Sequence, residues 1–166
     1  MAILRCTKKL LNELKIKPSV ETGLYNELGS WHANLLRIDR RKCVLFTHDR
    51  TLFSFFVPGL KKPQFQNFQE IFGQNLFKNL RRENFPQGQI EIMLEEHQEI
   101  AISKTNNRSV LGSMTDLAFQ LSYLISDAGG LSYVDIAELN YDINRVPMSA
   151  IDSFYGIDEL RKLLAD

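Results

Sequence analysis

The feature that most constrains the fold is a block of strand-like apolar runs between residues 31 and 57. Strand candidates at 31–38, 42–47 and 52–57 are separated by short polar links. The apolar residues in "KCVLFT" and "TLFSFFV" are continuous rather than alternating, which is typical of strands buried on both faces of a sheet. Because the links are short enough for hairpins, the sequence predicts antiparallel pairing, with helices covering both sides of the sheet.

The two links also predict turn geometry. The segments "DRR" at 39–41 and "HDR" at 48–50 lack the Asn-Gly or Asp-Gly signal of a tight primed turn. We therefore expect loops of about four or five residues at both places.

Further elements flank this block. "AILRCT" at 2–7 and "EIAIS" at 99–103 are strand candidates, and Thr7 is placed to cap a following helix. A helical apolar pattern follows Pro63, and a longer stripe predicts a helix over 108–127. The predicted fold is a single α+β domain over residues 1–166, with a mainly antiparallel sheet of about 4–5 strands and helices packed on it.

Composition limits the class of protein. The chain has 166 residues, of which 44% are hydrophobic and 24% charged, as is ordinary for a folded soluble protein. No apolar run approaches the roughly 20 residues that span a bilayer, and the N-terminus does not have the pattern of a secretory signal. Cys6 and Cys43 are too few for a disulfide framework. We expect a cytoplasmic protein with reduced thiols and no membrane contact.

The zero net charge hides an asymmetry between the two halves of the chain. Residues 1–82 hold 15 Lys and Arg against 6 Asp and Glu, whereas residues 83–166 hold 5 against 14. Such a division is typical of a basic face that binds nucleic acid or another polyanion. The alternative is that the two halves neutralise each other, within one domain or across a homodimer.

Two segments predict anion binding. The turn at 39–42 is the densest charge cluster, and "KTNNRSVLGSMTD" at 104–116 joins a strand to the long helix, whose exposed N–H groups favour anions. Solvated turn charges and plain helix capping are the alternatives for the two segments. The candidate anion-binding or nucleic-acid-binding residues are Lys8, Lys9, Asn34, Arg37, Arg40, Arg41, Lys42, Asn107, Arg108 and Ser109.

Another group of residues fits acid–base chemistry. The period of two in a strand over 31–38 puts His32 and Asn34 on one face, where an imidazole could act as a general base beside an amide. The alternative is that both are satisfied polar groups near the sheet edge. A phosphoester-acting, nuclease-like enzyme would need an acid or base, an orienting carboxylate and a cation, for which the candidates are His32, His48, Asp39, Asp49, Arg40 and Arg108.

Metal and cofactor signals are missing from the sequence. The histidines at 32, 48 and 97 have no ligand spacing, and neither cysteine lies in a Cys-x-x-Cys pair. No GK[ST] phosphate loop, GxGxxG or GxSxG motif occurs. We expect no metal site and no cofactor.

The motifs "WHANLLRIDRRKCVLFTHDRTLFSFFVPG", "NRSVLGSMTDLAF" and "LNYDINRVPM" carry a family resemblance. Together with "RCTKKLL", they resemble a family of small bacterial proteins known only as a domain of unknown function, over roughly residues 3–150. The resemblance implies a bacterial source and one intact domain, but no activity and no catalytic residue.

Three functions stay open at this point. The first is a binding module whose basic N-terminal half contacts nucleic acid or another phosphate-containing anion. The second is the enzyme described above. The third is a protein-interaction or antitoxin-like regulatory partner, in which the charge asymmetry serves association with another protein.

Overall fold

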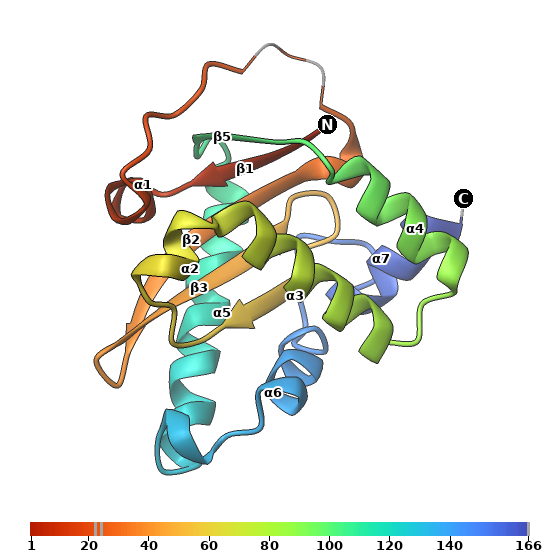
Figure 1. The fold of residues 1–166 in the computed structure, drawn as a ribbon. Coiled ribbons are helices and arrows are strands. Elements are labelled where there is room, and N and C mark those ends of the chain that lie inside the picture. Colours follow the sequence, from red (N-terminus) through yellow and green to blue (C-terminus); the bar gives the residue numbers. More distant parts are fainter. Residues whose placement is uncertain (22, 24, 166) are drawn as a thin grey trace.

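The centre of the fold is a mixed sheet with the strand order β4-β3-β2-β1-β5 (Figure 1). It is seen in a computed structural model that describes residues 1–21, 23 and 25–165. Within them, the sheet has five strands, which are β1 (Ala2–Cys6), β2 (Ser30–Ile38), β3 (Arg41–His48), β4 (Ser54–Val57) and β5 (Ile100–Lys104). The pairs β2–β3 and β3–β4 are antiparallel, while β1 runs parallel to both β2 and β5. The predicted α+β class with a mostly antiparallel sheet is confirmed; the parallel pairings of β1 were not predicted.

The β2–β3 hairpin is the longest pairing, with a register from Trp31↔His48 to Ile38↔Arg41. Its loop is therefore only the two residues Asp39 and Arg40, which both have positive φ (50° and 64°). This is the geometry of a type I′ turn, so the predicted longer loop was wrong here. The tight turn forms although Asp-Arg is not a preferred pair for it, because a tertiary contact stabilises the turn. The Asp39 carboxylate accepts a hydrogen bond from the Leu131 N–H at 2.6 Å.

The β3–β4 link agrees better with the sequence. The His48 N–H bonds the Phe53 carbonyl at 2.8 Å, and the Leu52 N–H bonds the His48 carbonyl at 2.8 Å. These bonds enclose a loop of four residues, Asp49 to Leu52, as the prediction of a four- or five-residue loop required. The loop also returns to β2, because the Asp49 N–H bonds the Ser30 carbonyl at 2.9 Å.

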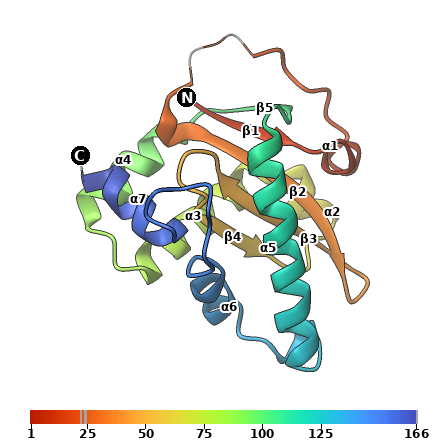
Figure 2. The ribbon, with the colours of Figure 1, turned by 180° about the vertical axis from the view of Figure 1, so that it is seen from behind.

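Helices cover both faces of the sheet, as the continuous apolar runs predicted (Figure 2). One core contains Trp31, Phe46 and Phe55 of the sheet and Phe72 of α3. The opposite core contains Leu45 of β3 and the buried stripe of α5. The helices of the first layer are α1 (Lys8–Leu14), α2 (Lys62–Gln66), α3 (Phe68–Arg82), α4 (Gln87–Glu96) and α7 (Gly156–Ala165); those of the second are α5 (Arg108–Asp127) and α6 (Ile136–Ile143).

Side-chain capping explains where α5 begins but not where α1 begins. The predicted helix over 108–127 is confirmed, and the Asn107 side chain caps it by accepting from the N–H groups of Ser109 and Val110. Thr7 stands at the start of α1 but makes no side-chain cap; its hydroxyl donates instead to Asn34 Oδ1 at 2.8 Å. The capping role predicted for Thr7 was therefore wrong: its hydroxyl is oriented toward Asn34 of β2, and its oxygen accepts no hydrogen bond from the first N–H groups of α1.

Asn140 of α6 and Asn144, the residue that follows the helix, cover the outer edge of β4. The Asn144 amide accepts from the Ser54 N–H and donates to the Ser54 carbonyl, both at 2.7 Å. Asn140 does the same for Phe56, at 2.6 Å and 3.2 Å. The match is geometric, since four residues of helix and two residues of strand both advance about 6 Å. The side-chain amides thus replace a neighbouring strand and close an edge that is otherwise open to aggregation.

Candidate functional site

A hollow with a volume of about 780 Å³ lies beside the β2–β3 hairpin. Four segments line it: the end of α1 (13–15), the hairpin tip (40–42), the β4–α2 connection with the first residue of α2 (59–62), and the end of α2 (65–66). We call it the basic hollow. Its volume lies within the roughly 300–1,000 Å³ range of small-ligand sites.

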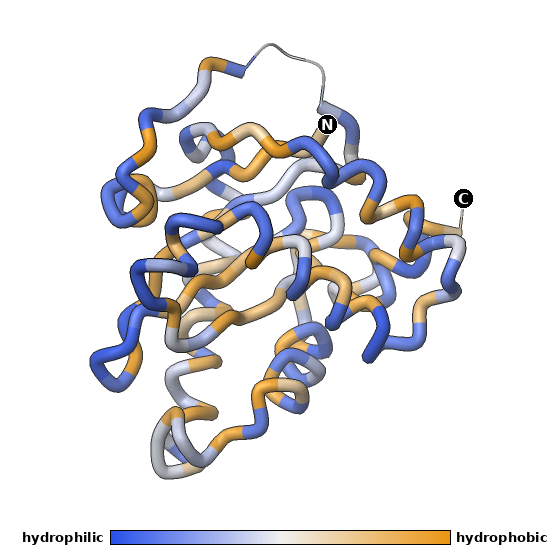
Figure 3. Tube along the Cα trace, viewed as in Figure 1, coloured by the Kyte–Doolittle hydropathy of each residue, from blue (hydrophilic) through white to orange (hydrophobic). Residues whose placement is uncertain are grey.

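The charge of the basic hollow is strongly positive. Its only acidic lining residue is Glu13, whose carboxylate already bonds Lys42 Nζ at 2.9 Å. Figure 3 shows the hairpin tip that borders it as a hydrophilic stretch of the chain. A concave surface lined by one sign of charge concentrates the opposite ion. The cationic lining residues are Lys15, Arg40, Arg41, Lys42, Lys61 and Lys62.

The backbone around the basic hollow adopts the left-handed conformation at three places. Lys15, Arg40 and Gly59 have φ values of 55°, 64° and 66°. Glycine takes this conformation without penalty, whereas other L-residues pay about 1–2 kcal/mol. Two long cationic side chains therefore occupy positions where glycine is favoured, and strain of this kind clusters at binding sites.

Contacts from the rest of the fold hold the hairpin tip in place. The bond from the Leu131 N–H to Asp39 ties it to the short helix η2 (Leu131–Tyr133), and the Leu60 N–H bonds the Lys42 carbonyl at 2.8 Å. Asp39 is thus a positioning residue for the basic turn. It lies seven residues along β2 from His32, about 23 Å of extended strand, so the structure does not bring it to that histidine.

Lys9 and Arg37 line a second hollow of about 700 Å³, which we call the adjoining groove. It shares Glu13 and Lys15 with the basic hollow. The structure thus gathers five of the predicted anion-binding residues at two connected hollows: Lys9, Arg37, Arg40, Arg41 and Lys42.

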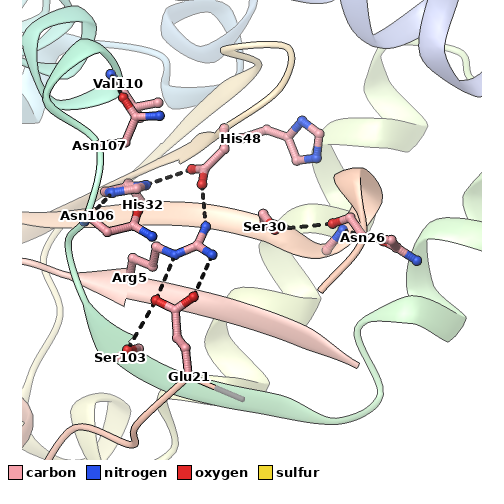
Figure 4. A network of polar contacts seen from close by, with 12 residues as sticks. Arg5, Glu21, Asn26, Ser30, His32, His48, Ser103, Asn106, Asn107 and Val110 are labelled. Carbon is pink, nitrogen blue, oxygen red and sulfur yellow. Dashed lines mark hydrogen bonds and ion pairs between the residues drawn. The ribbon is translucent and has the colours of Figure 1, made fainter. Parts of the chain in front are cut away.

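The predicted histidine site is a buried polar network at the other end of β2 (Figure 4). His32 Nδ1 bonds Asp49 Oδ1 at 2.7 Å, and the Asn106 N–H donates to His32 Nε2 at 3.3 Å. This pairing identifies Nδ1 as the protonated nitrogen. His32 is fully buried with both ring nitrogens bonded, so a ligand has no access to it in this arrangement.

Arg5 extends this network to the segment before β2. Its guanidinium bonds Asp49 at 2.6 Å and Glu21 at 2.8 Å and 3.1 Å. The hydrogen bond from Arg5 lowers the pKa of Glu21, and the same bond raises the pKa of Arg5. Ser103 Oγ adds a bond to the Ser19 carbonyl, so the network ties the segment before residue 21 to β1 and β5.

The remaining predicted residues serve the fold or stand apart from the basic hollow. His48 is buried and bonds Thr51 Oγ1 at 2.8 Å and the Leu28 carbonyl at 3.2 Å. Asn107 is occupied by its own helix, and its neighbours Arg108 and Ser109 are exposed there. Asn34 accepts from Thr7, and Lys8 is exposed at the start of α1. The histidines, the hairpin tip and the α5 N-terminus therefore do not form one composite site.

Three cations of the basic hollow were missed from the sequence: Lys15, Lys61 and Lys62. A signal for two of them was present. Val44 of β3 pairs with Val57 of β4 in an antiparallel register. The chain after Val57 therefore runs back along β3 toward the hairpin tip, which brings residues 59–62 beside it. Lys15 could not be placed this way, because its position depends on how α1 packs.

Metal and membrane features were sought over the described part of the chain. No group of three or more His, Cys, Asp or Glu side chains in residues 1–21, 23 and 25–165 is arranged to hold a metal ion. No helix among those residues has the length and apolar character needed to cross a bilayer.

Comparison with known proteins yields one match. A family model described as "Domain of unknown function (DUF6933)" matches residues 3–159. No curated protein and no solved structure matches the chain.

Proposed function

We propose that this chain, which belongs to the DUF6933 family, is a binding module. Its basic hollow binds the phosphate groups of a nucleic acid or another phosphate-containing anion. The observation that carries the proposal is the lining of the hollow. Three separate segments, 13–15, 40–42 and 59–62, place six cations at one cavity of ligand size, and its single carboxylate, Glu13, pairs with one of them, Lys42. Lys and Arg donors in such an arrangement bind phosphate oxygens.

The exposure of the hairpin tip supports the proposal. Arg40 and Arg41 are exposed there, while Lys42 pairs with Glu13. Exposed cations beside a concave surface contribute a positive field that attracts an anionic ligand.

Strain adds an independent argument. Arg40 and Lys15 keep left-handed conformations that glycine would take more cheaply. Their charged side chains border the hollow. Binding of an anion by these charges would explain why cationic residues stand where glycine would cost less conformational energy.

The test is a fluorescence-anisotropy titration of labelled single- and double-stranded DNA and RNA at salt concentrations between about 50 and about 200 mM. The variant Arg40→Ala/Arg41→Ala removes two charges of the basic hollow. Its charge-matched control is Lys78→Ala/Arg82→Ala, which removes two exposed cations of α3 outside the hollow.

We expect the affinity of the wild-type protein to fall steeply with salt. The slope of log affinity against log salt should drop by about 1.4 in the hollow variant, since each phosphate contact with a single strand contributes about 0.7. The control should keep the wild-type slope. Absence of binding at the lowest salt, or equal slopes in the two variants, would refute the proposal and direct attention to a protein partner.

A further inference from the structure

We infer that the basic hollow and the adjoining groove form one continuous track for a single-stranded nucleic acid. The inference rests on the proposed function and narrows its ligand to a flexible chain longer than one hollow. The two hollows, of about 780 and 700 Å³, are contiguous because Glu13 and Lys15 line both. Lys15, at the C-terminal end of α1, therefore marks the junction at which a bound chain passes from one hollow to the other.

The adjoining groove exists because β2 extends beyond the end of its neighbour β1. The parallel pairing ends at Cys6↔Ala33, and α1 begins two residues later. Beyond this point Leu35–Ile38 has β3 on one side only. Lys9 of α1 and Ser122 of α5 stand on the two sides of this free edge. The groove thus follows the strand toward the hairpin tip, where the basic hollow begins.

The groove offers both charged and neutral donors. Lys9, Lys15 and Arg37 line it and are exposed. The Ala33 carbonyl already points to the β1 side, since it accepts from the Thr7 N–H. By the period of two in a strand, Leu35 and Arg37 turn both their backbone N–H and their C=O groups to the same side. A phosphate chain in the groove therefore meets side-chain cations, and it meets backbone donors that alternate with carbonyl acceptors.

The shape of the track favours a single strand over a duplex. A duplex is a rigid rod that is recognised by elements projecting into its grooves, whereas single strands follow concave basic channels and stack their bases on aromatic side chains. Two aromatic side chains are exposed on the outer face of α5, within one turn of the groove residue Ser122. Phe119 and Tyr123, one turn apart on α5, are 73% and 61% exposed, and Phe119 lies one turn before the groove residue Ser122.

The experiment compares strand lengths and variants that touch different parts of the track. Binding is measured for single strands of about 3 and about 12 nucleotides, for a duplex, and for inorganic polyphosphate. The groove variant is Lys9→Ala/Arg37→Ala, and the hollow variant is Arg40→Ala/Arg41→Ala. The aromatic variant Phe119→Ala/Tyr123→Ala has as its control Tyr141→Ala, an exposed aromatic residue of α6. Melting temperatures verify that each variant is folded.

The account predicts a pattern that depends on length. The groove variant should weaken the long strand about 25-fold at about 0.1 M salt while leaving the short strand unchanged, and the hollow variant should weaken both. The aromatic variant should weaken the long strand at least about five-fold but leave polyphosphate binding intact.

Two outcomes separate this inference from the proposed function. If the long strand binds the groove variant as tightly as the wild type, or a duplex binds as tightly as a single strand, the track is overturned while the basic hollow stands. If the wild-type protein binds none of the four probes, the proposed function falls and the track with it.

Discussion

The hairpin tip allows one substitution to separate stability from binding. Asp39 and Arg40 form a two-residue turn in which both φ values are positive, and Arg40 at 64° occupies the position where type I′ turns favour glycine. Arg40 is exposed and borders the basic hollow. The substitution Arg40→Gly therefore relieves backbone strain and removes a binding charge at the same time.

The two effects have opposite signs. Replacing arginine by glycine in the left-handed conformation stabilises the folded state by about 1–2 kcal/mol. The greater conformational entropy of glycine in the unfolded chain offsets about 0.5–1 kcal/mol of this. The free energy of unfolding should rise by about 0.5–1 kcal/mol, which for a domain of this size raises the melting temperature by about 1–4 °C. The loss of one phosphate contact should lower the affinity for a single strand about five-fold at about 0.1 M salt.

Thermal unfolding and fluorescence anisotropy on the same preparations measure both quantities. Arg40→Lys is the matched control, since it keeps the charge and the conformational cost and should leave both values near those of the wild type. Lys15→Gly repeats the test at a second left-handed cation. A melting temperature that falls in Arg40→Gly, or an affinity that stays unchanged, would contradict the view that strain is tolerated there for binding.

Three further predictions concern the scaffold. Asn140→Ala or Asn144→Ala leaves one N–H and one C=O of β4 unpaired in the interior. Each substitution should lower the free energy of unfolding, measured in urea, by about 2–5 kcal/mol. A loss below about 1 kcal/mol would contradict the conclusion that these amides pair the edge of β4. Arg5 lowers the pKa of Glu21 from its ordinary 4.5, so the wild type should be more stable than Glu21→Gln by the full amount above pH 4.5. This difference in the free energy of unfolding should shrink as the pH falls through the lowered pKa. A difference that persists below that pH would contradict the role of the Arg5–Glu21 pair. Burial raises the pKa of the Cys6 thiol to about 12, so a thiol reagent should label it only as fast as the protein unfolds.

The sheet and the long helix could be predicted because their signals are local. The continuous apolar runs of β3 and β4 require burial on both faces, and α5 carries its cap at Asn107 and its apolar stripe in one uninterrupted segment. The turn at Asp39 and Arg40 escaped prediction because a contact with Leu131, remote in sequence, decides it. The edge-covering asparagines escaped for the same reason, since their role depends on how α6 docks against β4.

The candidate site was predicted in part. The density of charge at the hairpin tip pointed to Arg40, Arg41 and Lys42, which the structure places in the basic hollow. The sequence could not decide which carboxylate pairs with His32; the register of β2 against β3 gives that place to Asp49, because it brings the end of β3 beside Ser30. Residue type predicted the chemistry, whereas strand register decided which groups meet.

The most direct test of the account is to map a bound single strand onto the protein by amide chemical-shift perturbation in a ¹H–¹⁵N spectrum. The account predicts that the shifted resonances cluster at residues 13–15, 40–42 and 59–62 of the basic hollow, extend to 35–38 of the adjoining groove for a long strand, and leave the resonances of α4 in place. Shifts confined to other surfaces, or a spectrum unchanged by a large excess of the strand at low salt, would contradict the assignment of the basic hollow as the binding site.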